Sequence, residues 1–72
     1  MNFEQLKQFV CIVENKTYLE AAEILHMSQS SLSKSIIRLE KELDLKLFDR
    51  SKRNVSLTNH GQTFYHDAKI LL

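Results

Sequence analysis

Cysteine, proline and glycine are nearly missing from this chain of 72 residues, which has one Cys, one Gly and no Pro. A single cysteine excludes a disulfide within the chain. Together with the lack of a signal-peptide pattern, it predicts a cytoplasmic, reducing location. The scarcity of Pro and Gly favours helix. No apolar run approaches the roughly 20 residues that span a bilayer, so no membrane segment is expected.

Charge of one sign is not in excess either, since the net charge is only +1. The distribution of charge is more informative than the total. Residues 1–33 carry two lysines against four glutamates, whereas residues 34–53 carry seven cations against four acids. Positive charge is therefore gathered on one part of the chain, as a DNA-facing edge requires.

Residues for metal binding or catalysis are also sparse. His26, His60 and His66 have no cysteine or carboxylate cluster at ligand spacing, so a metal site is not expected. Cys11 falls near the apolar stripe of the first predicted helix, which favours a buried inert thiol over a nucleophile. A short helical chain has little room for a catalytic pocket, and the sequence predicts no enzyme and no cofactor.

Apolar spacing predicts helices over residues 3–15, about 18–26 and about 29–44, with another from residue 59 onwards. Small polar residues stand where helix N-caps are needed. The predicted caps are Asn2, Thr17, Ser28 and Thr58. Glu20, three residues after Thr17, completes a capping-box pattern. In the second helix Ala21 and Ala22 allow close packing, with Ile24 and Leu25 as apolar contacts. Tyr18 is expected to pack.

The third predicted helix has a buried stripe, and a different kind of segment follows it. The spacing i, i+4, i+7 and i+11 puts one set of side chains in the core: Leu32, Ile36, Leu39 and Leu43. Residues 46–50 and 55–57 look like short strands around a polar turn at 51–54. The sequence therefore predicts a small β-hairpin with a basic tip, a wing.

The start of the third helix is the strongest candidate for a nucleic-acid contact. A second helix that opens with small polar residues and a cation after a tight turn is typical of a helix-turn-helix. Gln29 could pair with adenine, and Ser30 or Ser33 could contact bases or phosphate. The alternative is a solvated, well-capped helix start. The candidate DNA contacts here are Ser28, Gln29, Ser30, Ser31, Ser33 and Lys34.

Further candidate contacts carry alternatives of their own. Arg38 could contact DNA, or pair with Glu42 one turn later. Thr17 could contact phosphate or only cap its helix. The wing cations could clamp the minor groove or the flanking backbone, or could simply keep a loop soluble. These wing candidates are Arg50, Lys52 and Arg53.

The whole chain resembles the N-terminal DNA-binding domain of LysR-type transcriptional regulators. Short motifs carry the resemblance, in order and over nearly all residues. They are Leu6-Lys7-Gln8-Phe9, Ala21-Ala22, Leu25-His26-Met27-Ser28-Gln29-Ser30, Leu32-Ser33-Lys34, Ile37-Arg38-Leu39-Glu40, Leu47-Phe48-Asp49-Arg50, Arg53, and Leu57-Thr58 with Gly61.

The resemblance implies a mainly α, winged helix-turn-helix fold with a three-helix core, a hairpin wing and a C-terminal linker helix. Residues 1–58 would form the DNA-binding domain, with the helix-turn-helix at about 18–37 and the wing at about 46–57. Residues 59–72 would begin a linker helix that pairs two copies into a homodimer on inverted-repeat DNA. The dimerisation candidates on this helix are Phe64, Tyr65, Ala68, Leu71 and Leu72.

The resemblance also implies an effector-binding domain, which this chain lacks. An excised fragment or a natural truncation would explain that lack, and the full-length regulator is expected to bind a small-molecule effector.

The chain departs from the family pattern at Lys16, where a small residue is common, and at Leu19, Ser31 and Ser35. Leu19 puts one commonly made phosphate contact in doubt. A different class of function, a protein-interaction module that uses the apolar face of the last helix, is the alternative to DNA binding.

Overall fold

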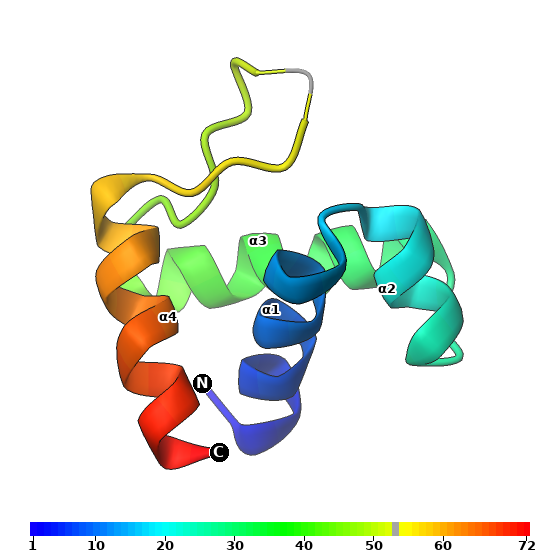
Figure 1. Ribbon diagram of the computed structural model, residues 1–72, viewed down its shortest axis with the longest axis horizontal. Coiled ribbons are helices and arrows are strands. Elements are labelled where there is room, and N and C mark those ends of the chain that lie inside the picture. The colour runs from blue at the N-terminus through cyan, green and yellow to red at the C-terminus, as the bar shows by residue number, and fades with distance from the viewer. Residues whose placement is uncertain (53) are drawn as a thin grey trace.

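The computed structural model describes residues 1–52 and 54–72, so the predicted wing contact Arg53 lies outside the described residues. It contains helices α1 (Phe3–Asn15), α2 (Tyr18–Ile24), α3 (Gln29–Leu43) and α4 (Asn59–Leu71). Figure 1 shows α1 lying across α3, with α2 and α4 on either side. α1 contacts the other three helices. Among the described residues, no helix is long and apolar enough to cross a membrane.

All four predicted N-caps are confirmed: each side chain accepts a hydrogen bond from the backbone N–H three residues later. The capping box, however, is formed by Asn2 and Gln5 and was wrongly predicted at Thr17. Gln5 is buried, and its Nε2 donates to the Ser35 carbonyl oxygen, which aims Oε1 at the Asn2 N–H. The Glu20 side chain is exposed, and among the described residues no hydrogen bond joins its carboxylate to the Thr17 N–H.

The core lies between α1 and α3. Phe9 and Ile12 from α1 are fully buried with the α3 stripe of Leu32, Ile36 and Leu39. The Phe9 ring also packs on aromatic residues from the rest of the chain, at 5.4 Å from Phe48 and 5.1 Å from Phe64 between ring centroids. Leu43, predicted for the same stripe, is only half-buried at the end of α3.

The helix-turn-helix consists of α2, a short turn and α3. Ala21 and Ala22 are buried, and α2 contacts both α1 and α3. α2 ends two residues earlier than predicted, because the chain turns at His26 with a left-handed φ of 58°. Ile24 is 57% exposed, so its predicted packing role was wrong. The buried side of this short helix is already filled by the two alanines.

The wing projects beyond the helices as a loop (Figure 1). In the described residues its pairing is one antiparallel bridge between Phe48 and Leu57, so the two predicted strands do not form a ladder. A hydrogen bond from Asp49 N to Ser56 O, 2.8 Å, lies beside the bridge. The Leu47 and Phe48 N–H groups donate to a side chain of α3, which holds the base of the wing against that helix.

Candidate nucleic-acid interface

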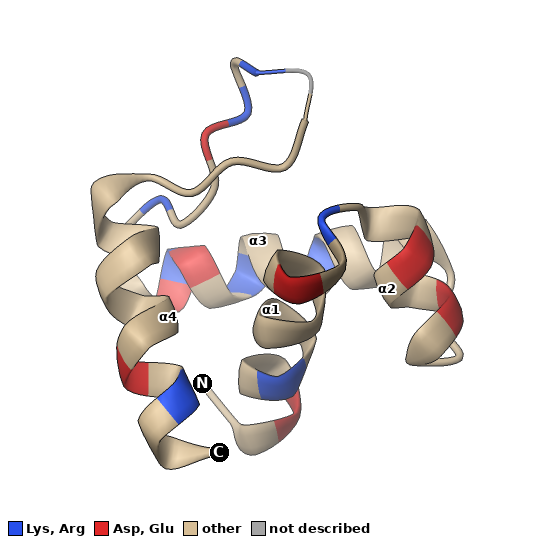
Figure 2. Cartoon of the chain, viewed as in Figure 1, with Lys and Arg blue, Asp and Glu red and all other residues tan. Residues whose placement is uncertain are grey.

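The outward face of α3 carries most of the predicted DNA contacts. Ser30, Lys34 and Arg38 are exposed, and by helical spacing they lie on the side opposite the buried stripe. Lys41 continues this face toward the end of the helix. Figure 2 shows basic residues on α3 and on the projecting wing. α3 thus presents hydroxyls followed by cations on the face that does not pack on α1.

The first turn of α3 is ordered by its own hydroxyl groups. Ser28 Oγ accepts from Ser31 N at 3.1 Å and donates to Ser31 Oγ at 2.9 Å. Ser30 Oγ lies 3.4 Å from the same hydroxyl, whereas Gln29 is exposed. The first turn contains no acidic residue. Its backbone N–H groups and positive dipole end therefore suit a phosphate.

Two other serines of α3 differ in their surroundings. Ser33 is half-buried. The Ser35 hydroxyl donates to Gln8 Oε1 of α1, and Gln8 Nε2 lies 3.6 Å from the Met27 sulfur. Ser35 therefore packs α3 on α1, which accounts for a small residue at this departure from the family pattern. Sequence reasoning missed buried Gln8; the available signal was its place beside the apolar stripe of α1.

The predicted alternative for Arg38, an ion pair with Glu42, is not found among the described residues. Glu42 instead contacts the terminal amino group of Met1. Lys34 has no salt bridge within the described part of the chain either. Lys34 and Arg38 are therefore placed to interact with a ligand outside the chain.

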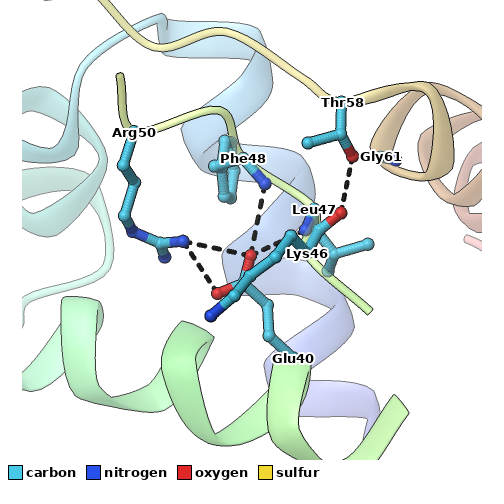
Figure 3. A network of polar contacts seen from close by, with 7 residues as sticks. All are labelled: Glu40, Lys46, Leu47, Phe48, Arg50, Thr58 and Gly61. Atoms are coloured by element: carbon cyan, nitrogen blue, oxygen red, sulfur yellow. Dashed lines mark hydrogen bonds and ion pairs between the residues drawn. The ribbon is translucent and has the colours of Figure 1, made fainter. Parts of the chain in front are cut away.

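Arg50, predicted to contact DNA, faces the protein at the base of the wing (Figure 3). Its Nη1 lies 2.9 Å from Oε1 and 3.2 Å from Oε2 of Glu40, a carboxylate that is only 2% exposed. Oε2 also accepts from Leu47 N at 2.7 Å and Phe48 N at 3.2 Å. Sequence reasoning missed this role of Glu40. The signal was an acid beside the buried stripe with no cation one turn away.

The other side of the wing base is held by the start of α4. The Thr58 hydroxyl donates to Lys46 O at 2.5 Å and accepts from Gly61 N at 2.9 Å. A Cβ on Gly61 would lie 2.0 Å from Leu47 O, so only glycine permits this approach of α4 to the wing. The base of the wing is thus fixed by both α3 and α4.

Of the remaining residues considered near the wing and α2, two have structural roles and one is exposed. The Thr17 hydroxyl accepts from Glu20 N at 3.0 Å, so it caps α2. The Tyr18 ring packs on Phe48, 5.9 Å between centroids, as predicted, and burial raises the pKa of its phenol. Lys52 is exposed near the tip of the wing.

The predicted dimerisation residues of α4 fall into two groups. Ala68 is buried, and the half-buried Phe64 packs on Phe9 of this chain's own core. The Tyr65 hydroxyl donates to Glu14 of α1 at 3.0 Å. Leu71 and Leu72 are 68% and 48% exposed, next to the exposed Ile70.

Within the described part of the chain, no cluster of His, Cys, Asp and Glu could hold a metal ion. Cys11 is half-buried rather than fully buried, and burial raises the pKa of its thiol. Asn15 Nδ2 lies 3.5 Å from its sulfur. A raised pKa keeps the thiol protonated and unreactive near neutral pH.

The sequence model of the family described as "Bacterial regulatory helix-turn-helix protein, lysR family" matches residues 3–62. The nitrogen assimilation regulatory protein nac of Escherichia coli is 43% identical over the whole chain, which covers 24% of that protein. The HTH-type transcriptional regulator ClcR of Pseudomonas putida is 42% identical, again with 24% covered. The chain thus spans about a quarter of the length of these relatives.

Solved structures show the same arrangement of helices. The BenM DBD/catB site 1 DNA complex superposes with a TM-score of 0.94 at 38% identity, over 99% of this chain and 79% of that one. The BenM DBD/benA site 1 DNA complex gives 0.95 at 38% identity, over 99% and 80%. Both are complexes of the BenM DBD with DNA, and the relatives named above are regulators rather than enzymes.

Proposed function

Because this chain belongs to the lysR family of bacterial regulatory helix-turn-helix proteins, we propose that α3 inserts its outward face into the major groove of operator DNA. The chain is a DNA-binding domain of a transcription regulator. The observation that carries the proposal is the set of exposed side chains on α3: Gln29 at its first position, followed on the outward face by Ser30, Lys34 and Arg38. Amide and hydroxyl groups can pair with base edges, and the cations with phosphates.

The wing is proposed to contact DNA that flanks this groove through Lys52 and Arg53. Arg50 has a different role, because its guanidinium is paired with the buried Glu40. It fixes the direction in which the wing leaves α3. Thr17, Ser28 and Ser31 would support backbone contacts from their places at the starts of α2 and α3, where their hydroxyls already order the helix ends.

We propose a division of the chain into a DNA-binding domain at 1–58 and the start of a dimerising helix at 59–72. Two copies would meet through Leu71 and Leu72, while Phe64, Tyr65 and Ala68 hold α4 to α1 within one copy. Dimerisation would place two α3 helices on an inverted repeat, because a two-fold protein matches a two-fold site. The whole regulator is proposed to bind a small-molecule effector outside this chain.

The test of the DNA-binding face is affinity for duplex DNA at several salt concentrations. Lys34→Ala should weaken binding and lower the slope of log affinity against log salt by about one, since one phosphate contact releases about one counterion. The matched control is Lys7→Ala, because Lys7 is exposed on α1 beside the Phe3 ring. Equal effects of the two substitutions would contradict the assigned face.

The wing contact and the dimer are tested separately. Lys52→Ala should also lower the salt slope, whereas binding unchanged in Lys52→Ala and Arg53→Ala would remove the wing from the interface. Leu71→Asp should shift sedimentation toward the monomer, with His60→Asp at the exposed start of α4 as control. If no duplex binds at low salt while the chain still self-associates, the protein-interaction alternative would be favoured instead.

A further inference from the structure

We propose that Ile37 is a specificity-determining residue that reads the 5-methyl group of a thymine in the major groove. The proposal rests on the proposed function, because it requires α3 to lie in that groove. The starting observation is an apolar side chain on a polar surface. Ile37 is 39% exposed and is not part of the buried core of the chain.

Ile37 continues the line of predicted base contacts along α3. Ser30, Ser33, Lys34 and Ile37 follow the spacing i, i+3, i+4 and i+7 within one uninterrupted helix. These four positions share one face. Homeodomain recognition helices read the major groove with residues at this same spacing. A helix placed to bring Ser33 and Lys34 to base edges therefore brings Ile37 there one turn later.

The surroundings of Ile37 suit DNA better than an apolar partner. It lines a shallow recess together with Lys34, Arg38 and Lys41. A protein-docking patch is normally a contiguous apolar area. Here a single branched side chain is enclosed by cations that can pair with phosphates of the groove edges. The partner that fits this surface is polyanionic, with an apolar group at the centre.

The thymine methyl is the one apolar group that a base pair presents in the major groove. Ile37 cannot donate or accept a hydrogen bond, so opposite any other base it would leave polar edge groups without a partner. That loss disfavours the other bases, while burial of the methyl favours thymine. Ile37 would therefore select thymine by contact and by exclusion.

Deoxyuridine provides the test, because it lacks only the 5-methyl group of thymidine. A duplex bound by the chain is first selected from a random pool, and each thymine is then replaced singly by deoxyuridine. For one thymine we expect affinity to fall about three- to fivefold, as loss of one buried methyl predicts. Ile37→Ala should bind the unmodified duplex more weakly and should no longer respond to deoxyuridine at that position.

Ile24→Ala is the matched control, because Ile24 is an isoleucine of α2 that is also exposed. It should keep the full response to deoxyuridine. The inference is overturned if no thymine responds, or if Ile37→Ala responds at every position as the unaltered chain does. Failure to select any duplex would instead count against the proposed function. Thermal unfolding of Ile37→Ala checks that its fold is retained.

Discussion

Arg50 Nη1 lies 2.9 Å from Glu40 Oε1, and this pair ties the wing to the far end of the proposed reading helix. The contact to Oε1 is an ion pair without an aligned hydrogen bond, whereas Oε2 accepts from Arg50 and from two backbone N–H groups. The carboxylate is buried, while the Arg50 side chain is 42% exposed. Glu40 is therefore the centre of the arrangement and Arg50 its outer partner.

Glu40→Ala should lower the free energy of unfolding by about 2–4 kcal/mol, because it leaves the Leu47 and Phe48 N–H groups buried without an acceptor. Glu40→Gln should cost less, since one amide oxygen can still accept from them. Urea unfolding measures both. Glu23→Ala on the exposed side of α2 is the control and should change stability by less than about 0.5 kcal/mol. Equal losses for Glu23 and Glu40 would contradict the role of Glu40.

Gly61→Ala should destabilise the chain by about 1–3 kcal/mol, because the added Cβ would overlap the Leu47 carbonyl oxygen. The overlap is with backbone, so α4 and the base of the wing must move apart. Thermal or urea unfolding provides the measurement. Gln62→Ala, at the next and exposed position of α4, should be nearly neutral. A neutral Gly61→Ala would show that the two segments are not held this closely.

Lys16→Gly should stabilise the chain by up to about 1 kcal/mol, because Lys16 ends α1 with a left-handed φ of 66°. Glycine adopts this conformation without strain, which explains why a small residue is common here in the family. Lys7→Gly should have the opposite effect, because glycine within α1 should lower the free energy of unfolding by about 1 kcal/mol. Paired urea titrations compare the two. Destabilisation by both would contradict the strain at Lys16.

The contact between α1 and α4 should weaken in acid. Hydrogen bonds from Lys69, at 2.7 Å, and from Tyr65 hold the pKa of Glu14 below its ordinary value of 4.5. A lowered pKa in the folded state contributes stability above the unfolded pKa and loses it as the pH falls through the folded value. The same pair raises the pKa of Lys69. The stability that Lys69 contributes is fully present below its unfolded pKa and is lost as the pH rises through its folded pKa.

The measurement is the stability of the unaltered chain minus that of Glu14→Gln, followed by urea unfolding from neutral to acidic pH. The difference should be constant near neutral pH and should vanish once Glu14 is protonated. The effect should be small and sensitive to salt, because both side chains are exposed. A difference that does not change with pH would show that Glu14 stabilises α4 by packing alone.

Local patterns in the sequence predicted the helices well. Caps depend on residues three apart and buried stripes on residues three or four apart, so Ser28 and Leu32 could be assigned from spacing alone. The wing was harder, because its strands were predicted from alternation within a few residues. The Leu47 and Phe48 N–H groups are held by Glu40, an acceptor on another element that no local pattern reveals.

Residues of the candidate interface were likewise predictable where their placement depends on local spacing, and not where it depends on contacts between elements. The exposure of Ser30, Lys34 and Arg38 follows from helical periodicity and could be predicted. The inward direction of Arg50 could not, since it depends on where the end of α3 lies relative to the wing. The same holds for Ala68, which packs on the core of its own chain although its helix was predicted to face a second copy.

The sequence by itself determined the elements: where each helix begins, which face of α3 is apolar, and where positive charge gathers. These properties are set by backbone hydrogen bonding and side-chain periodicity over a few residues. Only the tertiary structure decided which polar groups are used inside the protein. Burial makes an unpaired charge or N–H costly, so Glu40, Arg50 and the wing amides satisfy one another, and the outward cations of α3 are left for a partner.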